Sequence, residues 1–110
     1  MFNEIKSLDE FLRLKEEQVA MLVYFSTDAC SVCKVLKPKV EEMATAIFPK
    51  MQLIYVQSDV LPEVAAQNSV FIAPTIIVFF DGNETIRKSR AIGVDELQRE
   101  IARYYGLLFD

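Results

Sequence analysis

The sequence of 110 residues contains no histidine and only two cysteines. Without histidine the chain cannot supply an imidazole as a general base, which excludes Ser-His and Cys-His catalysis within the chain. A closed zinc site would need two carboxylates or a second chain beside the two cysteines, so a metal role for Cys30 and Cys33 is disfavoured. We therefore expect neither a metal ion nor another cofactor.

The sequence also lacks long apolar runs, basic clusters and glycine-rich loops. The apolar stretches around residues 22–25 and 76–80 are far too short to span a bilayer. A net charge of -4 argues against non-specific binding of nucleic acid, and no phosphate-binding motif is present. The first residues do not resemble a signal peptide. We expect a single domain over residues 1–110, located in the cytoplasm, with no membrane or nucleic-acid partner.

The most informative feature that is present is the segment Cys30-Ser31-Val32-Cys33, which follows an apolar run and opens a stretch with helical character. Two thiols three positions apart at a helix N-terminus can close a small disulfide ring. The helix dipole there favours the thiolate of Cys30, and a thiolate is the nucleophile of disulfide exchange. The spacing also fits two buried cysteines or half of a metal site. In a cytoplasmic chain a redox role is favoured over a permanent disulfide.

Hydrophobic periodicity predicts helices and strands that alternate along the chain. Ser7 and Glu10 form a capping-box pattern at the start of the first helix. The predicted helices cover residues 8–18, the stretch from the cysteines to Pro49, residues 62–67 and residues 95–105; the predicted strands cover 21–26, 53–57, 75–80 and 84–91. This order indicates an α/β protein with a mixed sheet between two helical layers.

Four local features occur in an order typical of one family. A buried strand ends just before the cysteine pair, and Pro38 lies five residues after Cys33, inside the following helix. Ala73-Pro74-Thr75 precedes an apolar strand, and a glycine turn leads through a hairpin to a C-terminal amphipathic helix. In these features the chain resembles thioredoxin over nearly its whole length. The resemblance implies the thioredoxin-like fold, a three-layer α/β/α structure with a central mixed sheet, and a cis peptide bond before Pro74.

The resemblance also implies a function, that of a thiol–disulfide oxidoreductase acting in cell redox homeostasis. Cys30 would attack a protein disulfide and Cys33 would resolve the mixed disulfide, while Ala73 and Pro74 would bind the substrate as an extended strand. The other expected substrate contacts are Ala29, Ser31, Val32 and Arg90. The expected partners are protein disulfides and a thioredoxin reductase, with the protein a monomer. The alternative is a binding module of the same fold whose cysteines are redox-inert or regulatory.

Several accessory positions depart from the family pattern. The tryptophan before the first cysteine is Ala29, and the Gly-Pro between the cysteines is Ser31-Val32. The family's buried aspartate aligns with Tyr24, its lysine neighbour with Tyr55, and a glycine beside the groove with Arg90. Without the carboxylate as proton acceptor, we expect slower attack by the resolving cysteine and a reduction potential different from that of thioredoxin. We interpret the two tyrosines as core aromatics.

Overall fold

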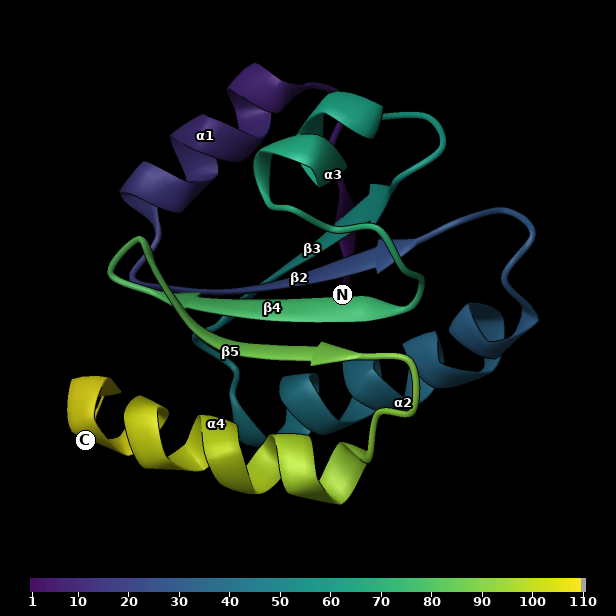
Figure 1. Ribbon diagram of the computed structural model, residues 1–110. Helices are drawn as coiled ribbons and strands as arrows, with labels where there is room; N and C mark the ends of the chain where they lie inside the picture. Colours follow the sequence, from purple (N-terminus) through teal and green to yellow (C-terminus); the bar gives the residue numbers. More distant parts are fainter. Residues whose placement is uncertain (110) are drawn as a thin grey trace.

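The computed structural model describes residues 1–109 as five strands and four helices (Figure 1). The helices are α1 (Leu8–Glu17), α2 (Ser31–Ile47), α3 (Pro62–Gln67) and α4 (Val94–Phe109). The strands are β1 (Asn3–Glu4), β2 (Ala20–Ser26), β3 (Gln52–Gln57), β4 (Thr75–Phe80) and β5 (Asn83–Ser89).

The strands form one sheet in the order β1-β3-β2-β4-β5. β3 pairs in parallel with both β1 and β2, whereas β4 pairs antiparallel with β2 and with β5. Helices α1 and α3 cover one face of the sheet, and α2 and α4 cover the other (Figure 1). The expected mixed sheet and three-layer α/β/α architecture are confirmed.

The central strand β2 is buried along its whole length because helices cover both of its faces. Its alternating side chains enter two apolar clusters. Leu22 and Tyr24 pack with α2 and α4, whereas Val23 and Phe25 pack with α1 and α3. The two cores hold β2 firmly, so the loop that follows Ser26 starts from a rigid position.

The last helix is longer than its sequence pattern predicts. The prediction ended at Tyr105, but α4 continues to Phe109, whose ring lies 4.6 Å from the ring of Tyr105 between centroids. Leu107 in the added turn is 82% exposed. The extension is therefore anchored by Phe109, which is partly buried against the core and also lies below Lys50 Nζ at 5.5 Å from its ring centroid.

The second strand of the hairpin is shorter than predicted. The prediction placed residues 84–91 in this strand, but β5 ends at Ser89. Arg90 has φ 66°, in the left-handed region, so the chain turns out of the sheet there. The prediction that this strand extends through Arg90 to residue 91 was wrong. Two further residues with positive φ, Asp81 at 53° and Gly82 at 77°, form the predicted hairpin turn.

Candidate active site

The two cysteines lie where the loop after β2 enters α2. Cys30 is the N-cap residue of α2, and its Sγ accepts a hydrogen bond from the backbone N–H of Cys33 at 3.2 Å. The two residues are joined by a disulfide bond, with 5.3 Å between their Cα atoms. Cys30 is half-buried, whereas Cys33 is only 1% exposed. A partner can therefore reach the sulfur of Cys30 and not that of Cys33.

The electrostatic surroundings of Cys30 favour negative charge on its sulfur. The first turn of α2 contains no acidic residue, and its free N–H groups and dipole point toward the N-cap. Asp28 and Asp59 lie in the neighbouring loops, where the Asp28 N–H donates to the Asp59 carboxylate at 3.3 Å. Both carboxylates are exposed and screened by solvent, while the Cys33 N–H contacts the sulfur directly. The N-terminus of α2 therefore has a larger influence on the Cys30 sulfur than the two carboxylates have.

A tyrosine occupies the core beneath the cysteine pair. Tyr24 is fully buried, and its hydroxyl donates a hydrogen bond to the carbonyl oxygen of Cys33 at 2.7 Å. Burial, and secondarily the neighbouring Tyr55, raise the pKa of Tyr24 to about 12. The phenol therefore stays protonated at ordinary pH. It can hold Cys33 in place but cannot accept a proton from its thiol.

Tyr55 lies at the margin of the core, beside Tyr24. Its ring stacks on that of Tyr24, with 6.2 Å between centroids and 20° between planes. The Nζ atom of Lys37, on α2, lies 4.0 Å from the centroid of the Tyr55 ring. The interpretation as a core aromatic is confirmed for Tyr24, whereas Tyr55 is half-buried.

The loop before β4 lies against the cysteine pair. The Ala73–Pro74 peptide bond is cis, as the resemblance implied. The backbone N–H of Arg90 donates to the Pro74 carbonyl oxygen at 3.0 Å, which ties the end of the hairpin to this loop. A groove of about 560 Å³ opens between the loop before β4, the residues that follow β5 and the start of α2. It is lined by Ala29, Cys30, Ser31, Val32, Ala73, Pro74, Arg90 and Ala91.

The groove thus brings together every residue that the sequence analysis selected for substrate binding, together with the nucleophile it selected. Cys33 lies behind Cys30, in the core formed by α2 and α4. Within residues 1–109, Ala91 also lines the groove and was not among the predicted site residues. It could have been found from its position next to Arg90.

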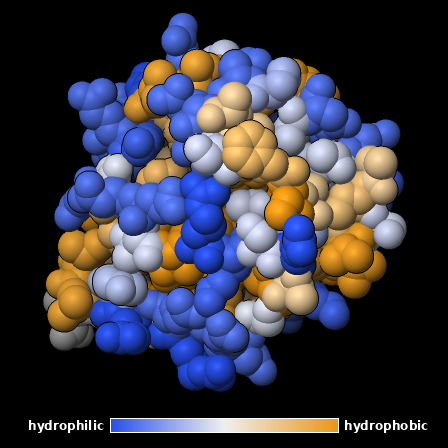
Figure 2. Space-filling view, in the orientation of Figure 1, coloured by the Kyte–Doolittle hydropathy of each residue, from blue (hydrophilic) through white to orange (hydrophobic). Residues whose placement is uncertain are grey.

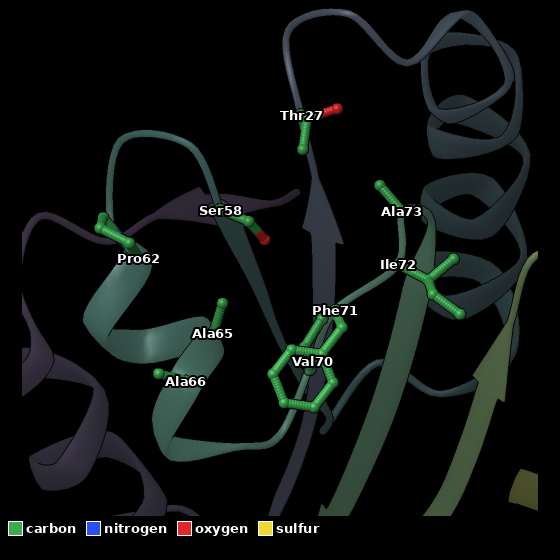
Figure 3. Close-up of a pocket in the computed structure, with 9 residues that line it drawn as sticks. All are labelled: Thr27, Ser58, Pro62, Ala65, Ala66, Val70, Phe71, Ile72 and Ala73. Carbon is green, nitrogen blue, oxygen red and sulfur yellow. The ribbon is translucent and has the colours of Figure 1, made fainter.

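A second hollow of about 280 Å³ adjoins the groove through Ala73 (Figure 3). It lies between α3 and the loop that leads to β4, and its walls are mostly apolar. Phe71 on this loop is 87% exposed, and Ser58 Oγ is buried there without a hydrogen-bond partner among residues 1–109. Phe71 was not among the predicted site residues, although an aromatic residue two positions before Ala73-Pro74 was a usable signal.

The apolar surface continues along the exposed side of α2. Val32 is 58% exposed and Val35 is 61% exposed, and both border a third hollow next to the groove. Figure 2 shows hydrophobic side chains at the right of the view, where Figure 1 places the start of α2. The reachable cysteine is therefore surrounded by apolar surface, which is typical of a site for a protein partner.

A family model describes this arrangement. The model for thioredoxin matches residues 5–103, nearly the whole chain. The chain belongs to the thioredoxin family. A thioredoxin-like protein of Bacillus subtilis is 28% identical over 105 residues, covering 96% of this chain and 90% of that protein. A thioredoxin of Staphylococcus aureus is 35% identical over 78 residues, covering 71% of this chain and 75% of its own.

Solved structures of thioredoxins share the fold. The thioredoxin of Plasmodium falciparum superposes with a TM-score of 0.83 at 25% identity, covering 93% of this chain and 98% of that one. A mutant thioredoxin from Halobacterium salinarum gives a TM-score of 0.85 at 22% identity, covering 94% and 90% of the two chains. The expected thioredoxin-like fold is confirmed.

Thioredoxin-family membership and a Cys-x-x-Cys pair at bonding distance make this protein a thiol–disulfide oxidoreductase, as expected from the sequence. Members of the family act on protein disulfides and are served by reductases. Within residues 1–109 no helix is long and apolar enough to cross a membrane. The same residues contain no cluster of three or more histidine, cysteine, aspartate or glutamate side chains that could hold a metal ion.

Proposed function

We propose that Cys30 is the attacking nucleophile and Cys33 the resolving cysteine of this thioredoxin-like oxidoreductase. In the reduced protein the Cys30 thiolate attacks one sulfur of a substrate disulfide. A Cys30–substrate bond forms as the substrate disulfide breaks, and the departing substrate thiolate takes a proton from solvent. Cys33 then loses its proton and attacks Cys30 Sγ. The Cys30–Cys33 disulfide forms, the second substrate thiolate leaves, and two electrons have passed to the substrate.

The difference in access between the two sulfurs carries this assignment. Cys30 lines the groove at the helix N-terminus, whereas Cys33 is 1% exposed and one turn farther into α2. Only Cys30 can approach a disulfide on another protein. Only an intramolecular attack, after Cys30 has formed the mixed disulfide, is open to Cys33.

The groove supplies the substrate site in this proposal. An extended segment of the substrate lies beside Ala73 and Pro74, next to the cysteine pair, in the manner of an added strand. Ala29, Ser31, Val32 and Arg90 also line this groove. The mostly uncharged lining suits a peptide backbone and small side chains.

The cellular setting is part of the same proposal. The only two cysteines of the chain form the exchange site, so the chain has no separate structural disulfide, which suits the reducing cytoplasm. A thioredoxin reductase is the proposed electron donor. Consumption of NADPH in the presence of such a reductase tests that partner.

We also propose that the chain is a single domain and a monomer. Both apolar cores lie on the same sheet, which supports one folding unit. At the sheet edges, β1 has only two residues and β5 carries Arg87 and Lys88, features that discourage pairing with another copy. Sedimentation over a range of concentrations measures the oligomeric state.

Trapping experiments test the roles of the two cysteines. A Cys33→Ser variant should accumulate mixed disulfides with cellular proteins that dithiothreitol releases, because the resolving thiol is gone. The matched Cys30→Ser variant should trap none, and the wild type should reduce insulin when dithiothreitol is supplied. If Cys33→Ser traps nothing and the wild type leaves insulin oxidised, the protein is instead a binding module with inert cysteines.

A further inference from the structure

Arg90 stands out in the groove by its backbone conformation. Its φ of 66° lies in the region that glycine adopts readily and residues with side chains rarely do. The hydrogen bond from its N–H to the Pro74 carbonyl oxygen holds this conformation. Uncommon backbone conformations persist most often at functional sites, and this one carries a long charged side chain into a binding groove.

The charge of Arg90 is not used within the described part of the chain. The two cations of the preceding strand β5 are paired: Arg87 with Glu84 at 2.8 Å, and Lys88 with Glu96 at 2.7 Å. Arg90 has no ion pair and no side-chain hydrogen bond among residues 1–109. Its guanidinium is therefore available to a ligand in the groove.

Among residues 1–109, those that line the groove and the hollow beside it include the cations Arg90 and Lys39 and no carboxylate, although the chain has a net charge of -4. Arg90 is the charged residue of the groove, and Lys39 is that of the hollow which shares Ser31 and Val32 with it. Lys39 also borders a further hollow whose lining includes Glu42 and Asp95. Arg90 is thus the cation that belongs to the groove alone.

We propose that Arg90 is a specificity-determining residue that selects disulfide substrates with an aspartate or glutamate beside the cysteine that Cys30 attacks. A guanidinium can bind a carboxylate through two parallel hydrogen bonds, which a single amide or ammonium group does not match. The inference rests on the proposed function, since the carboxylate is bound in the same groove in which Cys30 exchanges the disulfide.

Disulfide-linked peptide pairs that differ only at the residue beside the attacked cysteine test this proposal. With glutamate, glutamine or lysine at that position, kcat/KM of the wild type should be about three- to tenfold higher for glutamate than for glutamine, and lowest for lysine. The preference should shrink as NaCl is raised, because salt screens the exposed pair.

Variants assign the preference to one residue. In Arg90→Gln the glutamate-to-glutamine ratio should fall to about one, and Arg90→Glu should prefer lysine. Arg90→Gly removes the charge and restores a residue suited to the left-handed backbone, so it should lose the preference while folding normally. Arg103→Gln, an exposed arginine on α4, is the matched control and should keep the wild-type ratio.

The outcomes separate this proposal from the oxidoreductase proposal. A wild type that reduces the glutamate and glutamine peptides equally overturns the role of Arg90 and leaves the exchange reaction intact. A preference that persists in Arg90→Gln but disappears in Lys39→Gln also overturns it. A wild type that reduces none of the three peptides contradicts the proposed exchange reaction itself.

Discussion

The hydroxyl of Tyr24 donates a buried hydrogen bond to the carbonyl oxygen of Cys33, with 2.7 Å between the two oxygens. This bond joins the central strand β2 to the first turn of α2. It fixes the residue proposed to resolve the mixed disulfide relative to the rigid centre of the sheet. A side chain from the core thereby determines where the buried sulfur lies.

Removing that hydroxyl should destabilise the protein. In Tyr24→Phe the ring is retained but the Cys33 carbonyl loses its buried donor, which should lower the free energy of unfolding by about 1–2 kcal/mol. Urea denaturation of the oxidised protein measures this change. Tyr55→Phe is the matched control: the same hydroxyl is removed from the stacked partner ring at the core margin, and the loss should stay below about 0.5 kcal/mol. Equal losses in the two variants would contradict a specific contribution of the buried Tyr24 hydrogen bond.

The raised pKa of Tyr24 predicts a loss of stability in alkali. The folded protein keeps this proton up to about pH 12, whereas the unfolded chain releases it near the ordinary tyrosine pKa of 10.0. The stabilisation is therefore complete below pH 10 and is lost as the pH rises toward 12. Unfolding free energies at pH 8, 10 and 11.5 should fall more steeply for the wild type than for Tyr24→Phe. Parallel curves would contradict the assignment.

Much of the fold could be predicted from the sequence because its signals are local. Strand β4 and helix α3 begin and end where the patterns placed them, since Pro74 and Pro62 mark their starts. Strand β1 could not be predicted, because two paired residues carry no periodicity. The capping-box prediction was only partly right. The Ser7 hydroxyl accepts from the Glu10 backbone N–H as predicted, but the Glu10 carboxylate accepts from the backbone N–H of Lys6 and not from that of Ser7.

The site could be predicted as a set of residues but not as a geometry. The resemblance to thioredoxin identified the groove residues, because each of the family's motifs is a short continuous segment of the sequence. The Tyr24–Cys33 bond and the turn at Arg90 depend on how α2 and the hairpin pack against the sheet. No local pattern encodes contacts between segments that meet only after folding.

Arg87 should stabilise the hairpin against α3. Its Nη2 donates to the Asn68 carbonyl oxygen at 2.6 Å, and its Nε donates to Glu84 at 2.8 Å. Arg87→Gln should therefore cost about 1 kcal/mol of unfolding free energy, more than Glu84→Gln, which leaves the bond to Asn68 in place. Thermal or urea unfolding compares the two, with Arg103→Gln as the exposed control. A larger loss for Glu84→Gln than for Arg87→Gln would contradict the role of the bond to Asn68.

The same ion pair should respond to acid. The hydrogen bond from Arg87 lowers the pKa of Glu84 below its ordinary value of 4.5. A carboxyl with a lowered pKa contributes stability that is present above the unfolded value and is lost as the pH falls through the folded value. The stability difference between wild type and Glu84→Gln should therefore be constant from pH 6 to 8 and shrink below pH 4.5. A difference that grows on acidification would contradict the assignment.

Phe71 should contribute to the binding of protein substrates rather than to folding. It is 87% exposed and borders the hollow that adjoins the groove, so its ring can bury apolar area only when a partner covers it. Phe71→Ser should leave the unfolding free energy within about 0.5 kcal/mol of the wild type. It should raise KM for a protein disulfide about fivefold, since burial of part of an aromatic side chain is worth roughly 1 kcal/mol. Leu107→Ser is the control, because Leu107 is 82% exposed and belongs to the last turn of α4. The C-terminal end of α4 lies on the opposite side of the molecule from the loop between β2 and α2 (Figure 1). If both variants change KM equally, general surface hydrophobicity and not this hollow recruits the substrate.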